Sequence, residues 1–242
     1  MDNGWDESAG AWIADMGEHG DFTRRFVLDP VMTARVAGRG FATALDIGCG
    51  EGRFCRMLRG HGIRPVGIDP TAALLRRARE LDPEGDYREA RAEQLPFESG
   101  TFDLAVSYLT LIDIPDLDAA VAEMARVLRP GGTLLIANLS SFTTAAGEQA
   151  HWVRDEAGRP LHFPVDRYLE ERMYWTSWRG IRIHNWHRPL GRYMAALLGQ
   201  GLVLDFFAEP QAVAGADPAT ADRHRRAPYC YVMEWRKPGA VA

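Results

Sequence analysis

A glycine-rich turn between an apolar run and a helical pattern is the feature that most constrains the fold of this chain. Residues 42–47 are mainly apolar and lead directly into the glycine cluster at residues 48–52. A short apolar run bounded by glycines is typical of a buried parallel strand. Glycine is needed where the backbone takes a positive φ or approaches a ligand closely, and the amides at the start of the next helix can bind an anion. The turn therefore predicts a strand, an anion-binding loop and a helix.

The same alternation of apolar runs and helical patterns continues along the chain. We predict strands at residues 42–47, 64–68, 87–90, 101–108, 132–139, 202–207 and 229–235, and helices at residues 52–59, 71–81, 117–128 and 189–198. Thr71 stands where it could cap the second of these helices. Strands that alternate with helices favour right-handed crossovers and a parallel sheet covered by helices on both faces.

An aspartate at the predicted tip of the second strand adds a second ligand contact. Asp69 lies 23 positions after Asp46, in the sequence Gly67-Ile68-Asp69-Pro70. A carboxylate at this place can accept hydrogen bonds from both ribose hydroxyls of an adenosine ligand. Dinucleotide enzymes prefer a small residue at the sixth position of the glycine motif, where this chain has Arg53, and this argues against NAD. A plain turn and a helix-capping aspartate would explain each motif alone, but the pair favours an adenosine ligand.

Charge and composition exclude several other classes. The net charge of −5 and the pI of 5.8 argue against nucleic acid as the main partner. The three cysteines have no metal-ligand spacing and make a disulfide framework improbable. The first residues are acidic and polar, unlike a signal peptide, and no apolar run approaches the ~20 residues that span a bilayer. We therefore expect a cytoplasmic protein with no membrane partner.

Four sequence blocks together resemble one enzyme family. They are LDIGCGEG at 45–52, GIDP at 67–70, AEQLPFESGTFDLAVS at 92–107 and EMARVLRPGGTLLIA at 123–137. In this order they resemble the class I methyltransferases that depend on S-adenosylmethionine (SAM), especially the methyltransferase type 11 group. The resemblance implies an α/β fold with a Rossmann-like, doubly wound, mostly parallel seven-stranded sheet. It also implies SAM as the methyl donor, S-adenosylhomocysteine as the product, and no metal.

The resemblance also implies which residues hold the cofactor. Gly48, Cys49 and Gly50 would line the methionine part of SAM through their backbone, and Asp46 would pair with its ammonium group. Asp69 would take the ribose hydroxyls. Beside and at the edge of the adenine ring the implied residues are Pro70, Leu74, Ala92 and Glu93. At the tip of the fourth strand, Ser107 and Tyr108 would face the methyl donor and the substrate.

Two positions depart from the family pattern. Many relatives have an acid just before Ala92 that accepts from the adenine amino group, but this chain has Arg91. Many also have a histidine shortly after the fourth strand, where this chain reads Leu111-Ile112-Asp113. Any base that acts on the acceptor must therefore come from elsewhere, or no base is needed.

We interpret residues 1–242 as a single methyltransferase domain with four parts. Residues 1–38 form an N-terminal helical lid, and residues 39–139 form the SAM-binding half. Residues 140–187, which are rich in aromatic side chains, form a substrate-side insertion after the fifth strand. Residues 188–236 supply the last helix and strands.

The insertion contains the candidate residues for the chemistry. His187 is the first candidate for a general base, because imidazole titrates near neutral pH and a helix is expected to start just after it. The alternative is a histidine that packs and hydrogen-bonds to hold the insertion in place. Tyr108 is the aromatic residue expected to touch the substrate. The other aromatic candidates for the pocket are Trp152, Tyr168, Trp175, Trp178 and Trp186, of which one or two should face the ligand and the rest should form a small core.

The sequence leaves several functions open. The first is methyl transfer to an O or N atom, with C also possible, of a small metabolite that is aromatic or heteroaromatic. The alternatives are a tRNA or rRNA methyltransferase and a non-catalytic SAM-binding sensor or partner subunit. The expected partner is a small-molecule methyl acceptor rather than nucleic acid, and the chain could be a monomer or a dimer.

Overall fold

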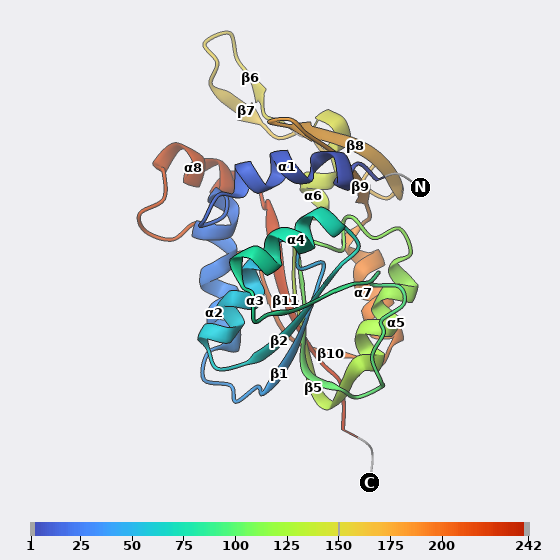
Figure 1. The fold of residues 1–242 in the computed structure, drawn as a ribbon. Coiled ribbons are helices and arrows are strands. Elements are labelled where there is room, and N and C mark those ends of the chain that lie inside the picture. The colour runs from blue at the N-terminus through green and yellow to red at the C-terminus, as the bar shows by residue number, and fades with distance from the viewer. Residues whose placement is uncertain (1–2, 150, 240–242) are drawn as a thin grey trace.

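A seven-stranded sheet forms the centre of the protein in its computed structural model, which describes residues 3–149 and 151–239 (Figure 1). Its strand order is β10-β11-β5-β4-β1-β2-β3. The bounds are Thr43–Ile47 for β1, Arg64–Asp69 for β2, Asp86–Glu89 for β3, Phe102–Tyr108 for β4, Leu128–Leu139 for β5, Val203–Ala208 for β10 and Cys230–Arg236 for β11. Strands β1 to β5 pair in parallel, whereas β11 runs antiparallel to both of its neighbours. The predicted fold class, a Rossmann-like, mostly parallel seven-stranded sheet, is confirmed.

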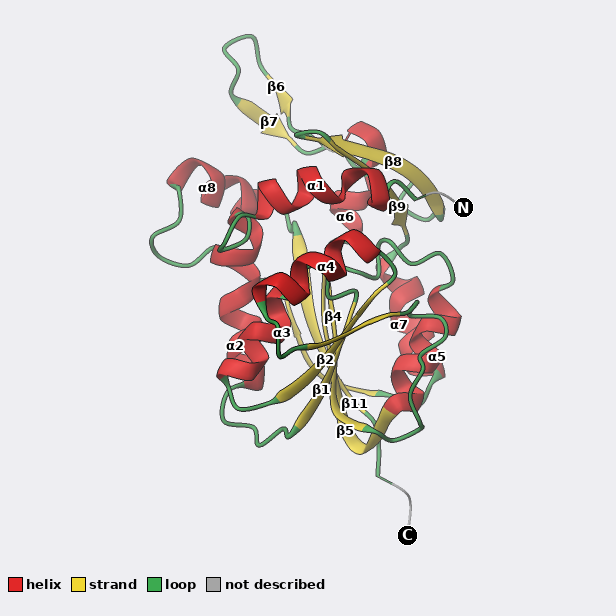
Figure 2. Cartoon of the chain, in the orientation of Figure 1, coloured by secondary structure: helices red, strands yellow, loops and turns green. Residues whose placement is uncertain are grey.

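Helices cover both faces of this sheet (Figure 2). On one face lie α2 (Asp29–Val36) and α3 (Arg53–Gly60), and on the other lie α5 (Leu117–Val127) and α7 (Leu190–Gly199). Successive residues of β5 point to opposite faces: Leu134 packs with α5 and α7, and Leu135 packs with α2 and α3. This is why the strands read as continuous apolar runs rather than as an alternating pattern. Among the described residues, no helix is both long and apolar enough to cross a bilayer.

The N-terminal segment contains α1 (Trp5–Met16), a π-helical turn at Arg24–Leu28, and α2. Of these, α1 lies across the carboxyl ends of the strands, and α2 packs on a face of the sheet (Figure 1). Helix α1 packs against α4 (Ala72–Leu81) and β9 (Ile181–His187), and its residues Trp12 and Met16 share a buried cluster with Leu74 of α4 (Figure 1). Helix α1, which belongs to the predicted lid segment, therefore lies at the edge of the sheet where a ligand would bind.

The segment between β5 and α7 folds as a short helix and two hairpins. They are α6 (Ser141–Ala145), a 3-10 turn at Gly147–Gln149, the hairpin of β6 (Val153–Arg154) with β7 (Pro160–His162), and the hairpin of β8 (Arg172–Trp178) with β9. The β6–β7 hairpin projects from the molecule (Figure 1). In β9 burial alternates: Ile181, Ile183, Asn185 and His187 are buried, and the residues between them are not.

Helix α8 and the start of α4 are two of the places where the structure differs from the sequence-based expectation. Helix α8 (Pro218–Arg226) was not predicted, because none of its residues is buried and it has no apolar stripe. It begins instead with Pro218 in its first turn and with Asp217, whose side chain accepts from the amide of Thr220. Thr71 does precede α4, but its side chain makes no cap, and its own amide donates to Asp69.

Candidate functional site

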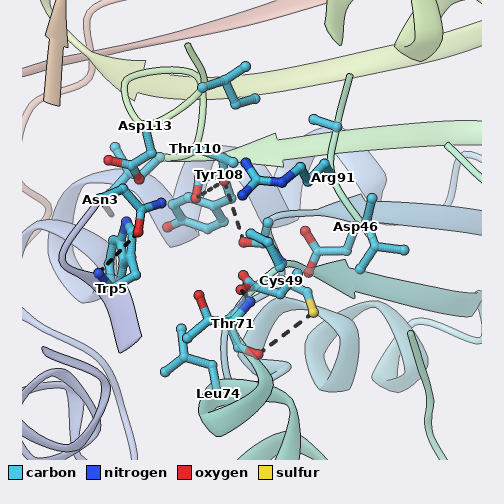
Figure 3. A pocket seen from close by; sticks show the side chains of 18 of the residues that line it. Asn3, Trp5, Asp46, Cys49, Thr71, Leu74, Arg91, Tyr108, Thr110 and Asp113 are labelled. Carbon is cyan, nitrogen blue, oxygen red and sulfur yellow. Dashed lines mark hydrogen bonds between the residues drawn. The ribbon is translucent and has the colours of Figure 1, made fainter. Parts of the chain in front are cut away.

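A cavity of about 310 Å³ opens at the carboxyl ends of β1, β2 and β4 (Figure 3). Its walls come from the glycine loop, the ends of these strands, helix α1 and strand β9. In an open α/β sheet this edge is where ligands bind, because the strand ends and helix N-termini meet there. The volume lies at the lower end of the range for small-molecule sites.

The glycine loop has the backbone shape that only glycine takes without strain. Gly48, Gly50 and Gly52 have φ values of 74°, 55° and 76°. The amides of Gly48 and Cys49 both donate to the carbonyl of Ile68, at 2.8 and 2.9 Å, which ties the loop to the end of β2. A methyl group added to Gly48 would lie 2.2 Å from Cγ2 of Thr110. The loop is therefore closely packed on one side and open to the cavity on the other.

Asp69 joins the loop to the start of α4. Its Oδ2 accepts from the amide of Gly50 at 3.0 Å, and its Oδ1 accepts from the amide of Thr71 at 2.8 Å. Burial raises the pKa of Asp69, and these two hydrogen bonds oppose the rise. Each carboxylate oxygen has more than one acceptor site, so each can take a further donor from a ligand in the cavity.

Two more acids in the cavity wall keep an oxygen atom that lacks a hydrogen bond among the described residues. Asp46 is 1% exposed; its Oδ2 accepts from Sγ of Cys55 at 3.3 Å, and its Oδ1 has no partner. Burial, with smaller contributions from Asp69 and Glu51, raises the pKa of Asp46 to about 7. Glu51 pairs with Arg56 through Oε2 at 2.6 Å, and its Oε1 has no partner. A buried acceptor without a partner is costly, so this wall suits a cationic N–H donor such as the ammonium group of an amino acid.

Tyr108 lines the cavity and fastens the N-terminal segment to β4. Its hydroxyl donates to Oδ1 of Asp29 at 2.8 Å, and Asp29 also forms an ion pair with Arg53. Burial and the nearby Asp29 raise the pKa of Tyr108, so it stays a neutral phenol. Ser107, the other residue predicted at this strand tip, is fully buried, and its hydroxyl does not line the cavity.

The residues predicted beside the adenine ring all lie on the cavity wall. They are Pro70, Leu74, Ala92 and Glu93, and with them the structure brings Arg91 to the same wall. Arg91 itself is exposed. The predicted residues of the loop and of β2, namely Asp46, Gly48, Cys49, Gly50 and Asp69, line the cavity as well.

His187 lies outside the cavity. It is 0% exposed, its Nδ1 is 2.8 Å from Oγ1 of Thr144, and its Nε2 is 2.8 Å from the carbonyl of Tyr168. Both ring nitrogens are therefore occupied, and burial lowers the pKa of His187. This arrangement is the one expected of the alternative, a histidine that holds the insertion in place.

Of the five aromatic candidates in the insertion, Trp186 lines the cavity and the other four do not. Trp152 donates to the hydroxyl of Tyr229, Tyr168 packs against His187, Trp175 packs against His184 with the two rings tilted, and Trp178 donates to Asp15. The insertion thus uses most of its aromatic side chains for its own packing. The period-two pattern of β9 indicates which of its side chains face the cavity, because His184 and Trp186 share one face of the strand and His187 lies on the other.

Several cavity residues were not predicted. They are Asn3, Trp5, Arg24, Thr110, Asp113, Met173 and His184. They come from α1 and the segments beside it, from the loop after β4 and from the second hairpin, which lie far apart in the sequence. No local motif could have grouped them, although Asp113 stands close to the place where the family pattern has a histidine.

Comparisons with known proteins agree with this site. Residues 45–136 match the family model described as "Methyltransferase domain". The chain is 36% identical to the malonyl-[acyl-carrier protein] O-methyltransferase of Enterobacter lignolyticus over 68% of this chain and 63% of that protein. It is 31% identical to the Salmonella typhimurium protein of the same name over 61% of this chain and 58% of that protein. The chain thus spans about three fifths of the length of these curated relatives.

A solved structure supports the likeness over nearly the whole chain. The S-adenosylmethionine dependent methyltransferase from Mesorhizobium loti superimposes with a TM-score of 0.75 at 27% identity, over 91% of this chain and 100% of that one. The fold, the site and these comparisons agree with the resemblance seen in the sequence: the chain is similar to the class I, Rossmann-like SAM-dependent methyltransferases of the type 11-like group, in sequence over residues 45–136 and in fold over nearly its whole length.

Proposed function

We propose that this protein transfers the methyl group of SAM to an oxygen or nitrogen atom of a small acceptor that carries an aromatic or heteroaromatic ring. The observation that carries the proposal is the pairing of the glycine loop with Asp69 at one cavity. The amide of Gly50 donates to the Asp69 carboxylate, so the loop and the acid form one unit. One unit of this kind can hold the two ends of a nucleoside that carries an amino-acid group.

The residues present fit SAM. Asp46 and Glu51 each have a buried oxygen that accepts no hydrogen bond from the part of the chain that the structure describes, which suits the ammonium group. Arg24, which lines the same cavity, supplies a positive charge for the carboxylate, and Asp69 would take the ribose hydroxyls. Pro70, Leu74 and Ala92 would cover the adenine ring.

SAM supplies a methyl group that is already activated by the sulfonium charge. What this chain adds is alignment and exclusion of water, which can lower a barrier by about 7–11 kcal/mol. Trp5, Trp12 and Met16 of α1 line the cavity and keep water from the reacting atoms. Tyr108 fixes this lid to the sheet through its hydrogen bond to Asp29.

Aromatic and apolar side chains also line the cavity. Trp5, Trp186 and Met173 line it, and His184 adds an imidazole ring. Planar side chains of this kind favour a planar acceptor, through stacking and burial of its ring.

The curated relatives favour a second candidate, methyl transfer to a carboxylate, because their name describes O-methylation of a malonyl group on a carrier protein. Such an acceptor is already an anion and needs no base. The acids that line this cavity, Asp46, Asp69 and Asp113, would repel it.

Calorimetry with S-adenosylhomocysteine, followed by transfer of labelled methyl, tests the proposal. We expect micromolar binding of S-adenosylhomocysteine and no response to NAD. Labelled methyl should then pass to small aromatic acceptors and not to bulk tRNA or to malonyl-carrier protein. Binding of NAD instead of S-adenosylhomocysteine would disprove the use of SAM. Methylation of only the carrier-bound carboxylate would disprove the aromatic acceptor.

A further inference from the structure

Asp113, in the loop after β4, is a cavity-lining acid that the cofactor does not need. Figure 3 shows it with Asn3 and Trp5 at one end of the cavity, while Asp46 lies toward the other end. The predicted contacts to SAM are made by Asp46, Asp69 and the glycine loop. Asp113 therefore faces the part of the cavity that is left for the acceptor.

Asn185 and Trp186 of strand β9, together with Arg188 directly after the strand, hold this loop in place. Nδ2 of Asn185 donates to Oδ1 of Asp113 at 2.6 Å, and the amide of Trp186 donates to the carbonyl of Ile112 at 2.6 Å. The guanidinium of Arg188, which is 2% exposed, donates to the carbonyls of Leu111, Ile114 and Pro115 at 3.2, 2.8 and 2.8 Å. A buried arginine that binds three carbonyls of one loop fixes that loop firmly. The carboxylate at its centre is thus preorganised.

The surroundings of Asp113 suit a proton acceptor. Asn185 is itself 4% exposed and donates to Oδ1 of Asp113, which lines the cavity. Burial raises the pKa of Asp113 well above its ordinary value, and hydrogen bonds from Asn185 and Trp5 partly oppose the rise. The charged groups that act on it are Asp69 and Arg24, and His184 of β9 lines the same cavity.

We propose that Asp113 is the acceptor-binding carboxylate of this enzyme: it accepts a hydrogen bond, and then the proton, from an aromatic hydroxyl or ring N–H group of the acceptor, with Asn185 as its positioning residue. This inference rests on the proposed methyl transfer and adds the residue and the chemical class of the acceptor. An acceptor that presents a carboxylate to Asp113 would place two like charges together in a partly buried site. The geometry therefore favours neutral hydroxyl or N–H donors.

In the proposed step the acceptor gains one methyl group and loses one proton. A lone pair of the acceptor oxygen or nitrogen forms the new bond to the methyl carbon, the S–CH3 bond breaks, and its electron pair stays on sulfur. The proton of the acceptor passes to Oδ2 of Asp113 and from there to water. A base in this position contributes about 10²–10⁴-fold to the rate.

The test is a labelled-methyl screen of matched compounds with wild type, Asp113→Asn, Asn185→Ala and the control Asp118→Asn. The panel pairs hydroxybenzenes, hydroxyquinolines, indoles and imidazoles with benzoate and aliphatic dicarboxylates. Asp118 is a suitable control because it is an exposed acid on α5 that pairs with Arg192 at the surface. We expect wild type to methylate compounds with an aromatic hydroxyl or ring N–H, and Asp118→Asn to match it.

Asp113→Asn should lower kcat at least 100-fold, with the Kd for S-adenosylhomocysteine unchanged within threefold. Its acid limb in the pH–rate profile should disappear, whereas a merely structural defect would leave that limb in place. Asn185→Ala should lower kcat by about 3- to 30-fold and shift the limb. In calorimetry on the protein loaded with S-adenosylhomocysteine, wild type should prefer the hydroxyl compound to its methyl ether at least tenfold, and Asp113→Asn less than threefold.

The outcomes separate the two proposals. Failure of wild type to bind S-adenosylhomocysteine would disprove the proposed function. Binding without transfer to any compound of the panel, or transfer only to the aliphatic dicarboxylates, would also disprove it. Transfer to benzoate but to no hydroxyl or N–H compound, or an Asp113→Asn variant with more than half of the wild-type kcat, would overturn the role of Asp113 alone.

Discussion

Replacing Asp69 by alanine removes the carboxylate that links the glycine loop to α4 and that would hold the ribose. Two charge-assisted hydrogen bonds to ribose hydroxyls are worth about 1.5–3 kcal/mol each, which sets an upper limit of about 6 kcal/mol. Water can enter the open cavity and replace part of this. We therefore expect a loss of about 3 kcal/mol, which weakens the binding of S-adenosylhomocysteine by roughly 100- to 200-fold.

Isothermal titration calorimetry of the purified variant measures this loss directly. The variant also leaves the amides of Gly50 and Thr71 without their acceptor, so its melting temperature must be measured beside the affinity. Asp222→Ala is the control, because Asp222 is a surface acid on α8 that pairs with Arg225 and Arg226. A folded Asp69→Ala protein whose Kd changes less than threefold would refute the assignment of the ribose contact.

Three further predictions concern buried groups around the site. The folded-state pKa of Asp46 is raised from 3.8 to about 7, so its contribution to stability is present below about pH 4 and is lost as the pH rises to about 7. Urea unfolding should show that the free energy of unfolding of wild type falls over this range by up to about 4 kcal/mol relative to that of Asp46→Asn. Free energies that change in parallel with pH in the two proteins would contradict this. His187→Ala should lower the free energy of unfolding by about 2–4 kcal/mol, because it leaves a cavity and unpaired polar groups. Its kcat should stay within tenfold of wild type. A hundredfold loss of kcat in a stable variant would instead support a role of His187 as a base. Gly48→Ala should destabilise the protein by more than about 1 kcal/mol, because the added methyl group would meet Thr110 and because φ at this position is positive. In thermal unfolding, the double variant Gly48→Ala/Thr110→Gly should regain only the part of the lost stability that the clash causes. Full recovery of the lost stability would argue against backbone strain.

The order of strands and helices could be predicted from the sequence because each unit is local. Residues 42–47 and the glycines after them have a local pattern that is typical of a buried strand followed by a tight turn. The elements of the sheet followed from such local patterns, and the cofactor-side residues that the family resemblance implied line one cavity, apart from Ser107. Helix α8 could not be predicted from apolar periodicity, because none of its residues is buried and its sequence has no regularly spaced apolar residues.

The acceptor side of the site could not be predicted in this way. His187 and His184 stand three positions apart in one strand, and composition cannot distinguish them. Their pairing with β8 and α1 turns His184 to the cavity and buries His187. A period-two reading of residues 181–187 would have separated them, because alternate side chains in a strand point to opposite faces.

The sequence by itself determined the parallel sheet, the glycine loop and the acid at the tip of the second strand, since each depends on neighbouring residues and on backbone conformations that few residue types can adopt. The tertiary structure alone decided which side chains meet around the acceptor. Trp5 comes from α1, Asp113 from the loop after β4, and Asn185 from a strand about 70 residues further along. Such contacts depend on how distant segments pack, and no local pattern encodes that packing.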